Sequence, residues 1–211
     1  MKRFFSIIAV VSLLVFMFPQ TALAKNNTDL NSQVQIVGEY TYSIFDYFSD
    51  LNYIVVVQNN SQSALTIDAK GYGLDSSGTI VEVDEDTIYC LGPGKQAVLD
   101  FWLENDDNNE VAFTTQLNVS KADYIKDYSN YISYSTTTTS NSAIVTLTNT
   151  GNREADVKTQ AIFFSGANIV YFDYDYELDM SPGQSMAVQL DSGDRAFDNC
   201  LVFVQADYYS F

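Results

Sequence analysis

The chain has 211 residues, of which 27 are Asp or Glu and 10 are Lys or Arg, so its formal net charge is −17 at pH 7. A surface this acidic repels phosphate groups, which excludes nucleic acid and anionic membrane surfaces as partners. The sequence contains no His, which removes the Ser-His-Asp triad, the Cys-His pair and imidazole metal ligands. We therefore expect a non-catalytic protein without a cofactor, since only carboxylate chemistry remains for catalysis.

The first 24 residues have the pattern of a secretory signal peptide. Lys2 and Arg3 form a positive start, an apolar run extends from Phe4 to Phe18, and Ala22-Leu23-Ala24 is a small-residue cleavage site. The apolar run is short for a membrane span of about 20 residues. We predict cleavage before Lys25 and a secreted, extracellular product that does not contact the membrane. The alternative is a retained N-terminal anchor.

The rest of the chain carries an internal repeat. Val55–Ser61 recurs as Val145–Gly151, an offset of 145 − 55 = 90 residues, and Leu91–Gly94 recurs as Met180–Gly183, an offset of 180 − 91 = 89. A repeat this long is a whole domain and not a solenoid unit. The predicted parts are a flexible N-terminal segment at 25–33, a first module at 34–121 and a second module at 122–211.

Both modules show the period-two alternation of antiparallel strands, with turn residues between the strands, which is typical of a β-sandwich. We predict an all-β fold of two tandem Ig-like antiparallel β-sandwich domains, with seven or so strands in each, that fold independently as separate beads. The side chains assigned to shared strand faces are Tyr53, Val55, Val57, Leu65, Ile67, Ala69, Leu99, Phe101, Phe113, Thr115 and Leu117, and in the second module Ala143, Val145, Leu147, Ala155, Val157, Thr159, Val188, Leu190, Leu201 and Phe203.

Turn chemistry recurs at matching places in the two modules. Asn59–Ser61 and Asn149–Gly151 are predicted to cap their own turns through side-chain hydrogen bonds. Asp75–Gly78 is predicted to form a tight hairpin whose Gly has a positive φ, and Pro93-Gly94 and Pro182-Gly183 fit type II turns. These motifs build the scaffold and form no site.

A Ser- and Thr-rich stretch, Ser135–Ser142, has the composition of a linker. It aligns with Phe45–Asn52 at the same offset of 135 − 45 = 90 residues. We therefore predict a loop between the first two strands of the second module and not a domain boundary.

The turn pattern of Asn59–Ser61, Asp75–Val81 and Leu91–Gly94 resembles the FxLYD-type modules of secreted and surface proteins of Gram-positive bacteria. The resemblance implies tandem Ig-like β-sandwiches with no assigned activity and no catalytic residues to carry over. At the positions of the Phe-x-Leu-Tyr-Asp signature the chain has Gly71–Asp75 and Ala161–Ser165, of which only Asp75 matches.

The run Tyr171–Glu177 separates aromatic from acidic side chains if it forms a strand. An acidic row could hold a cation or sugar hydroxyls, or it could protect a sheet edge from aggregation, which we favour because the first module has acids at the aligned positions. One face holds Phe172, Tyr174 and Tyr176, the other holds Tyr171, Asp173, Asp175 and Glu177, and the aligned acids are Glu82, Asp84 and Asp86.

The densest acidic loop is Glu104–Glu110, and Asp191–Asp194 is its counterpart. Calcium takes six to eight oxygen ligands, of which Asp106, Asn108 and Glu110 supply three. We read both loops as solvated turns, with calcium binding as the alternative.

An aromatic group near the first hairpin offers a platform for carbohydrate. Its members are Tyr40, Tyr42, Phe45, Tyr47 and Phe48. Exposed rings on a sandwich face would favour sugar binding, whereas buried rings would belong to the core of an ordinary β domain.

Cys90 and Cys200 lie at positions of the two modules that do not correspond. Two free thiols are the favoured reading, and an inter-domain disulfide is the alternative in an oxidising compartment. The predicted function is that of an extracellular binding or spacer module whose partner is an extracellular protein or a cell-wall or glycan ligand. The alternative is a carbohydrate-binding module, with or without calcium.

Overall fold

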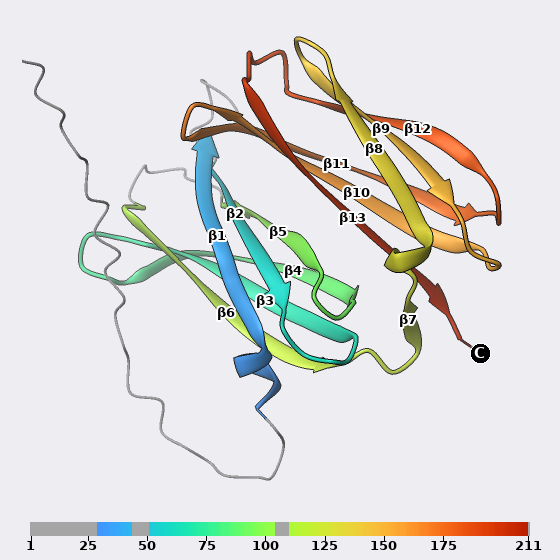
Figure 1. The fold of residues 1–211 in the computed structure, drawn as a ribbon. Coiled ribbons are helices and arrows are strands. Elements are labelled where there is room, and N and C mark those ends of the chain that lie inside the picture. The colour runs from blue at the N-terminus through green and yellow to red at the C-terminus, as the bar shows by residue number, and fades with distance from the viewer. Residues whose placement is uncertain (1–28, 44–50, 104–109, 211) are drawn as a thin grey trace, which may run out of the picture.

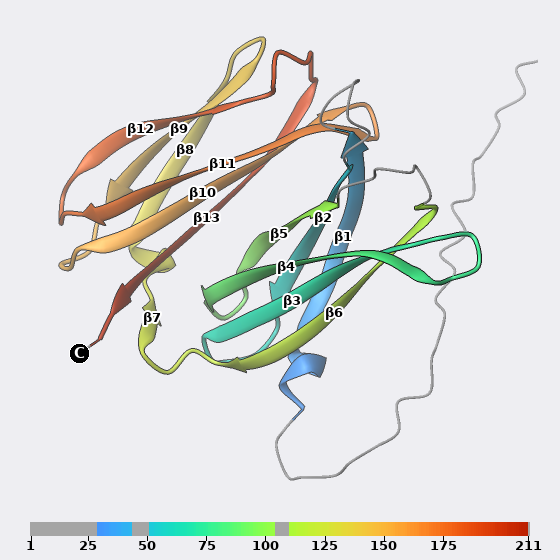
Figure 2. The same ribbon diagram turned by 180° about the vertical axis from the view of Figure 1, so that it is seen from behind.

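The computed structural model describes residues 29–43, 51–103 and 110–210. These residues form antiparallel β-sheets, and their only helical elements are the short 3-10 helices η1 (Leu30–Gln33) and η2 (Ser129–Tyr131). The predicted all-β fold is confirmed, and the paired sheets are consistent with β-sandwich packing. Figures 1 and 2 show the strands gathered into two halves that lie side by side.

The N-terminal half (29–121) contains two three-stranded sheets. We name the sheet with order β1-β2-β5 the N-inner sheet and the sheet with order β4-β3-β6 the N-outer sheet. The strands are β1 (Val34–Ser43), β2 (Leu51–Asn59), β3 (Leu65–Leu74), β4 (Ile80–Leu91), β5 (Gln96–Leu103) and β6 (Ala112–Lys121).

The C-terminal half (122–210) repeats this arrangement and adds β7. Its four-stranded C-inner sheet has the order β11-β10-β13-β7, and its three-stranded C-outer sheet has the order β12-β9-β8. The strands β7–β13 meet the expected number of seven, whereas the described N-terminal half has only β1–β6. Their bounds are β7 (Ile125–Asp127), β8 (Ile132–Thr138), β9 (Ser142–Asn149), β10 (Ala155–Ser165), β11 (Asn168–Met180), β12 (Ser185–Asp191) and β13 (Asn199–Tyr209).

Three apolar layers join the four sheets into one stack. One buried cluster fills the space between the two N-terminal sheets, and a second fills the space between the two C-terminal sheets. A third lies between the inner sheets, where Ile54 and Val98 meet Ile162. The expectation of separate beads is therefore wrong. The buried members of this shared layer are Tyr42, Ile54, Val56, Val98, Ile162, Phe164, Ile169, Phe172 and Phe203.

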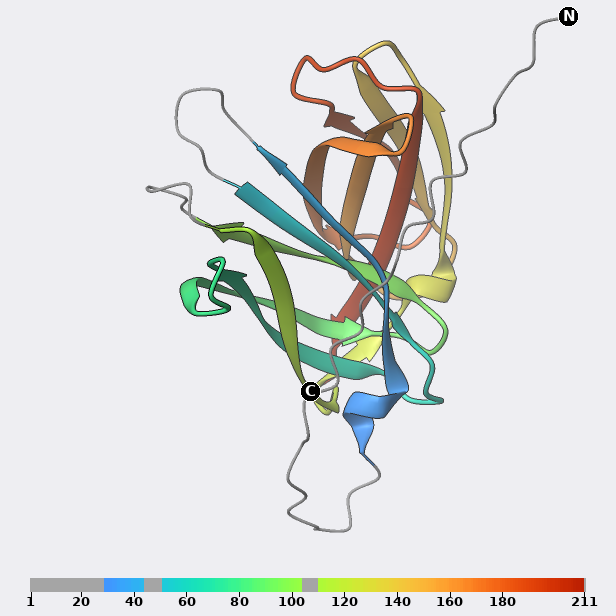
Figure 3. The same ribbon diagram turned by 90° about the vertical axis from the view of Figure 1, so that its left-hand side faces the viewer.

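The shared layer exists because the central strand of each inner sheet is apolar on both faces. In β2 every residue from Asn52 to Val57 is buried, and in β10 every residue from Thr159 to Phe164 is buried. Strands buried on both faces have continuous apolar runs and not clean alternation. Figure 3 shows the two halves in contact along this side, seen at right angles to Figure 1.

Most predicted strand faces are correct, because side chains such as Tyr53, Val57 and Val145 lie in the cores of their own halves. The assignment of Leu201 and Phe203 is the exception. Leu201 is exposed and Phe203 belongs to the shared layer, while the alternate residues of β13 from Cys200 to Val204 pack into the C-terminal core. This strand is apolar at consecutive positions, so alternation gave no signal for its orientation.

The Ser/Thr-rich stretch is mostly strand and not loop. β8 continues to Thr138, and only residues 139–141 separate it from β9, which starts at Ser142. Thr is β-branched and favours extended backbone, and the turn is closed by the Ser142 amide, which donates to Thr139 Oγ1 at 3.0 Å. The stretch lies between β8 and β9, which match β1 and β2 of the N-terminal half, but β7 precedes them, so they are the second and third strands of this half.

The predicted turns form as expected. The Ser61 amide donates to Asn59 Oδ1 at 2.8 Å, and the Gly151 amide donates to Asn149 Oδ1 at 3.0 Å. Both Asn side chains are fully buried and each donates from Nδ2 to two backbone carbonyl groups. The turn glycines have φ values between 72° and 80°, the left-handed region that type II turns require. They are Gly78, Gly94 and Gly183.

Candidate functional site

The predicted aromatic platform is not an exposed surface where the structure describes it. Tyr42 is 7% exposed and lies in the shared layer, and the Tyr40 ring packs edge-on against Phe164 with ring centroids 5.3 Å apart. Both rings hold the two halves together. Phe45, Tyr47 and Phe48 lie outside the described residues.

The acidic row of β11 and its counterpart in β4 lie on edge strands, as predicted. Their carboxylates also form hydrogen bonds between the two facing sheets of each half. Asp84 Oδ2 accepts a hydrogen bond from the Trp102 amide at 2.7 Å, and Asp173 Oδ2 accepts one from the Asp191 amide at the same distance. Each bond joins an edge strand of one sheet to the edge strand of the facing sheet, so these acids satisfy backbone donors. Burial raises the pKa of Asp173.

The densest acidic loop, Glu104–Glu110, lies outside the described residues except for Glu110. Its counterpart, Asp191–Asp194, forms a turn in which Gly193 and Asp194 have φ values of 62° and 60°. Among the described residues, no group of three or more Cys, Asp and Glu side chains could hold a metal ion.

The two cysteines are free thiols in this structure. Cys90 Sγ lies 3.8 Å from the Ile125 carbonyl oxygen, close to the end of β13, whereas Cys200 lies at the start of β13. Strand geometry puts these ends about 30 Å apart, and a disulfide needs Cα atoms within about 7 Å. Burial raises the pKa of Cys90 to about 12 and that of Cys200 to about 11, which keeps both thiols protonated at neutral pH.

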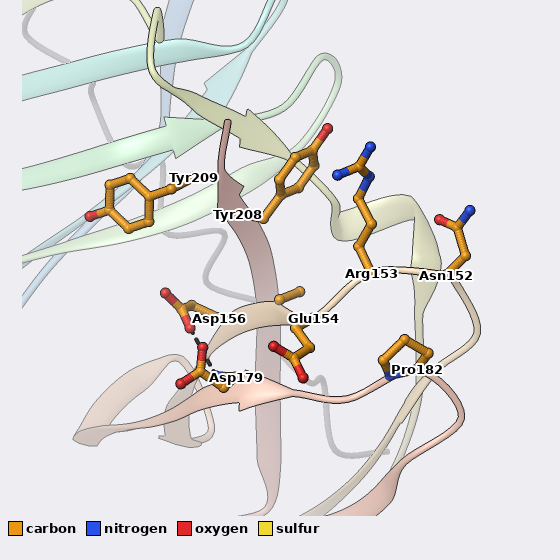
Figure 4. A pocket seen from close by; sticks show the side chains of 9 residues that line it. Asn152, Arg153, Glu154, Asp156, Asp179, Pro182, Tyr208 and Tyr209 are labelled. Atoms are coloured by element: carbon orange, nitrogen blue, oxygen red, sulfur yellow. Dashed lines mark hydrogen bonds between the residues drawn. The ribbon is translucent and has the colours of Figure 1, made fainter. Parts of the chain in front are cut away.

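A pocket of about 590 Å³ opens at the end of the C-terminal half. The turn before β10, the end of β11 and the end of β13 supply its walls. Figure 4 shows Glu154, Asp156 and Asp179 on one side, with Tyr208 and Arg153 on the other. The Arg153 guanidinium lies 5.0 Å from the centre of the Tyr208 ring. The full lining is Asn152, Arg153, Glu154, Ala155, Asp156, Asp179, Pro182, Tyr208 and Tyr209.

Asp179 holds an unusual backbone conformation at the rim of this pocket. Its φ is 54°, a left-handed value that non-glycine residues seldom adopt and that clusters at functional sites. Its amide donates to Asp156 Oδ1 at 3.0 Å, the bond drawn in Figure 4. The two carboxyl groups are thus fixed side by side and face the same cavity.

Asp156 also belongs to a row of carboxyl groups that crosses three neighbouring strands. It is the cross-strand partner of Asp207, which is in turn the partner of Asp127. Burial, followed by the charges of Asp156 and Asp127, raises the pKa of Asp207 to about 6. Like charges directly opposite one another destabilise a sheet, so this row of carboxyl groups favours a bound proton.

The corresponding end of the N-terminal half is closed. There the Ala122 amide donates to the Ala64 carbonyl at 3.1 Å, and a Cβ on Gly92 would overlap the Asp127 carboxylate. At the repeat offsets, Ala64 corresponds to Glu154 (154 − 64 = 90) and Cys90 corresponds to Asp179 (179 − 90 = 89). The closed end therefore has small side chains where the open pocket has carboxylates.

A buried glutamine ties the two inner sheets together. Gln160 is 1% exposed, its Nε2 donates to the Val98 carbonyl at 2.9 Å, and its Oε1 accepts from the Val98 amide at 3.1 Å. Gln205 Nε2 donates to the same Oε1 at 2.9 Å. Because β5 is the edge of the N-inner sheet, the Gln160 amide takes the place of a neighbouring strand there.

We expect Gln160→Met to lower the free energy of unfolding by about 2–4 kcal/mol, since it leaves the buried Val98 amide and carbonyl unpaired. Gln189→Met, at an exposed position, is the matched control, with an expected change below about 0.5 kcal/mol. Urea denaturation of both variants measures the difference. Equal stability of the two would contradict the bridging role.

Sequence reasoning missed both the pocket and the Gln160 bridge. The pocket combines residues from 152 to 209, and no local pattern joins them. The one available signal was the substitution of acids at Glu154 and Asp179 for small residues in the first copy. The shared layer had a clearer signal in the uninterrupted apolar runs of β2 and β10.

In the part of the chain that the structure describes, no helix has the length and apolar composition to cross a membrane. No family model matches this chain, and no curated protein matches it. The resemblance to FxLYD-type modules stays a prediction.

Proposed function

We propose that this is a secreted, non-catalytic protein of two tandem Ig-like β-sandwich modules, 34–121 and 122–211, that binds an extracellular ligand. The matching order of the sheets in the two halves supports the two-module arrangement. The matching bonds of Asn59 and Asn149 support it independently. The N-terminal pattern that ends at Ala24 supports secretion.

The pocket at the end of the C-terminal half carries the proposal of ligand binding. The second module departs from the first here, because the matching end of the first module is covered by residues 122–127. A cavity with polar groups that converge on it is the ordinary form of a small-ligand site.

Carbohydrate is the ligand class that fits the lining best. Tyr209 is 57% exposed and presents a ring to stack on a sugar face. Glu154, Asp156 and Asp179 supply acceptors for sugar hydroxyl groups. This moves the proposed sugar site from the first hairpin to the far end of the second module, and calcium is a candidate aid to binding.

The test is a glycan array and a pull-down on cell-wall fractions with the chain that begins at Lys25. We expect Tyr209→Ala to lower affinity for the bound glycan at least tenfold, while Tyr89→Ala, which is 64% exposed in the other half, leaves it unchanged. Arms with calcium and with a chelator separate calcium-assisted from unassisted binding. Absence of any glycan or cell-wall binding, or equal binding by both variants, would overturn the proposal.

A further inference from the structure

The outward face of the N-outer sheet carries an apolar patch. Ile80 is 55% exposed and Val83 is 48% exposed. Tyr72 is the cross-strand partner of Val83, and Leu74 is the partner of Ile80, so the four side chains form two adjacent rows on one face. We name them the N-outer patch.

The residues of the N-outer patch occupy the positions of the first module that are equivalent to the C-inner residues packed in the shared layer. In the C-inner sheet, Ile162 pairs with Phe172 and Phe164 pairs with Ile169. The offsets are 162 − 72 = 90, 164 − 74 = 90, 169 − 80 = 89 and 172 − 83 = 89. The first module therefore exposes the positions that the second module uses to dock on the N-inner sheet.

The face that would complete such a contact lies on the C-outer sheet. On the N-inner sheet the docking face is formed by Ile54, Val56 and Val98. At the repeat offsets these correspond to Ile144, Thr146 and Ala187 on the C-outer sheet, of which Ile144 is half-buried and the other two are exposed. These three outward positions carry no charge, and Thr146 presents a methyl group.

Charge does not oppose contact at the positions of these two faces that would meet. The N-outer face carries an ion pair between Lys70 and Glu85 beside the patch, and the facing positions of the C-outer sheet are uncharged. Two copies of a chain with a net charge of −17 repel each other at long range, but salt screens that repulsion, so neutral faces are the ones that can meet.

We propose that a second copy of this chain docks its C-outer sheet on the N-outer patch, so that the sheet stacking within the chain continues between chains. Such a contact is heterologous, because each copy uses a different face, and it produces head-to-tail oligomers. The hydroxyl groups of the C-outer sheet make it less apolar than the N-inner sheet, so the association is weak.

Sedimentation of the chain that begins at Lys25, in about 0.5 M salt and up to about 1 mM protein, measures the association. We expect the average mass to rise past that of a dimer. Val83→Asp and Ala187→Asp, both at exposed positions, should each lower the association constant at least tenfold. Tyr124→Asp, at a side chain 80% exposed outside both faces, is the control and should have no effect.

Mixing the two variants identifies which faces meet. Val83→Asp keeps an intact C-outer face and Ala187→Asp keeps an intact N-outer patch, so an equimolar mixture should form dimers that grow no further. A chain that stays monomeric at every concentration would overturn the proposal. So would loss of association in Val83→Asp alone, since that result means that two N-outer patches meet each other.

Discussion

Replacing Ile162 by Ala is expected to lower the free energy of unfolding by about 2–4 kcal/mol, the usual cost of truncating a fully buried aliphatic side chain. Ile162 is 0% exposed and lies in the shared layer between the inner sheets, opposite a surface that includes Ile54. The cavity would open between the two halves and not within either core. The substitution therefore weakens the coupling of the halves.

The coupling can be followed with the single Trp of the chain. Trp102 lies in β5 of the N-terminal half, so its fluorescence reports that half alone, whereas far-ultraviolet circular dichroism reports both. In the unmodified chain we expect the two signals to change together with urea. In Ile162→Ala we expect them to separate.

Ile80→Ala is the matched control, because Ile80 has the outward position on the N-outer sheet that Ile169 has on the C-inner sheet. With its side chain 55% exposed, truncation should cost less than about 0.5 kcal/mol. Coincident transitions in Ile162→Ala, with a loss below about 1 kcal/mol, would show that the shared layer does not couple the halves.

Local chemistry explains why so much of the fold was predictable. Turns such as Asn59–Ser61 and Asn149–Gly151 are built by their own side chains, and the inward faces of strands such as β9 follow period-two alternation. Neither feature depends on which other strands lie nearby. The all-β class follows from these patterns alone.

The contacts between sheets could not be predicted in the same way. Whether the Asp84 carboxylate binds a cation or a backbone amide depends on which strand of the facing sheet lies next to it. In the structure that strand is β5, and its Trp102 amide donates to Asp84. Tyr42 is an aromatic residue of the kind that binds sugars, but the C-terminal half covers it in the folded chain. Such features arise where one sheet meets another, and the sequence carries only the hint of an uninterrupted apolar run.

A buried acid beside the shared layer makes stability depend on pH. Burial, followed by the charge of Asp86, raises the pKa of Asp100 to about 7 from 3.8, while Lys158 acts in the opposite direction. Asp100 Oδ1 is buried without a hydrogen-bond partner. The groups that face Asp100 come from β4, β10 and β1, and they include Asp84, Asp86, Lys158 and Tyr42.

The sign of the pH dependence follows from the direction in which the pKa of Asp100 is shifted. Between pH 4 and pH 7 the folded chain holds a proton on Asp100 that the unfolded chain has lost, so stability falls as pH rises through this window. The loss amounts to about 4 kcal/mol by pH 8, with a limiting slope of about 1.4 kcal/mol per pH unit. Asp207 has a pKa of about 6 and adds a dependence of the same sign.

Asp100→Asn is expected to match the unmodified chain near pH 4 and to exceed its stability by about 4 kcal/mol at pH 8, because a neutral amide replaces the buried charge. Urea denaturation at intervals from pH 4 to pH 9 measures the difference. Asp207→Asn isolates the contribution of Asp207 to the pH dependence. The loss of stability from ionising Asp207 should already be complete near pH 7. If the pH dependence of Asp100→Asn parallels that of the unmodified chain, Asp100 is ionised in the folded protein without cost, and the arrangement of charges around it must differ from the one described.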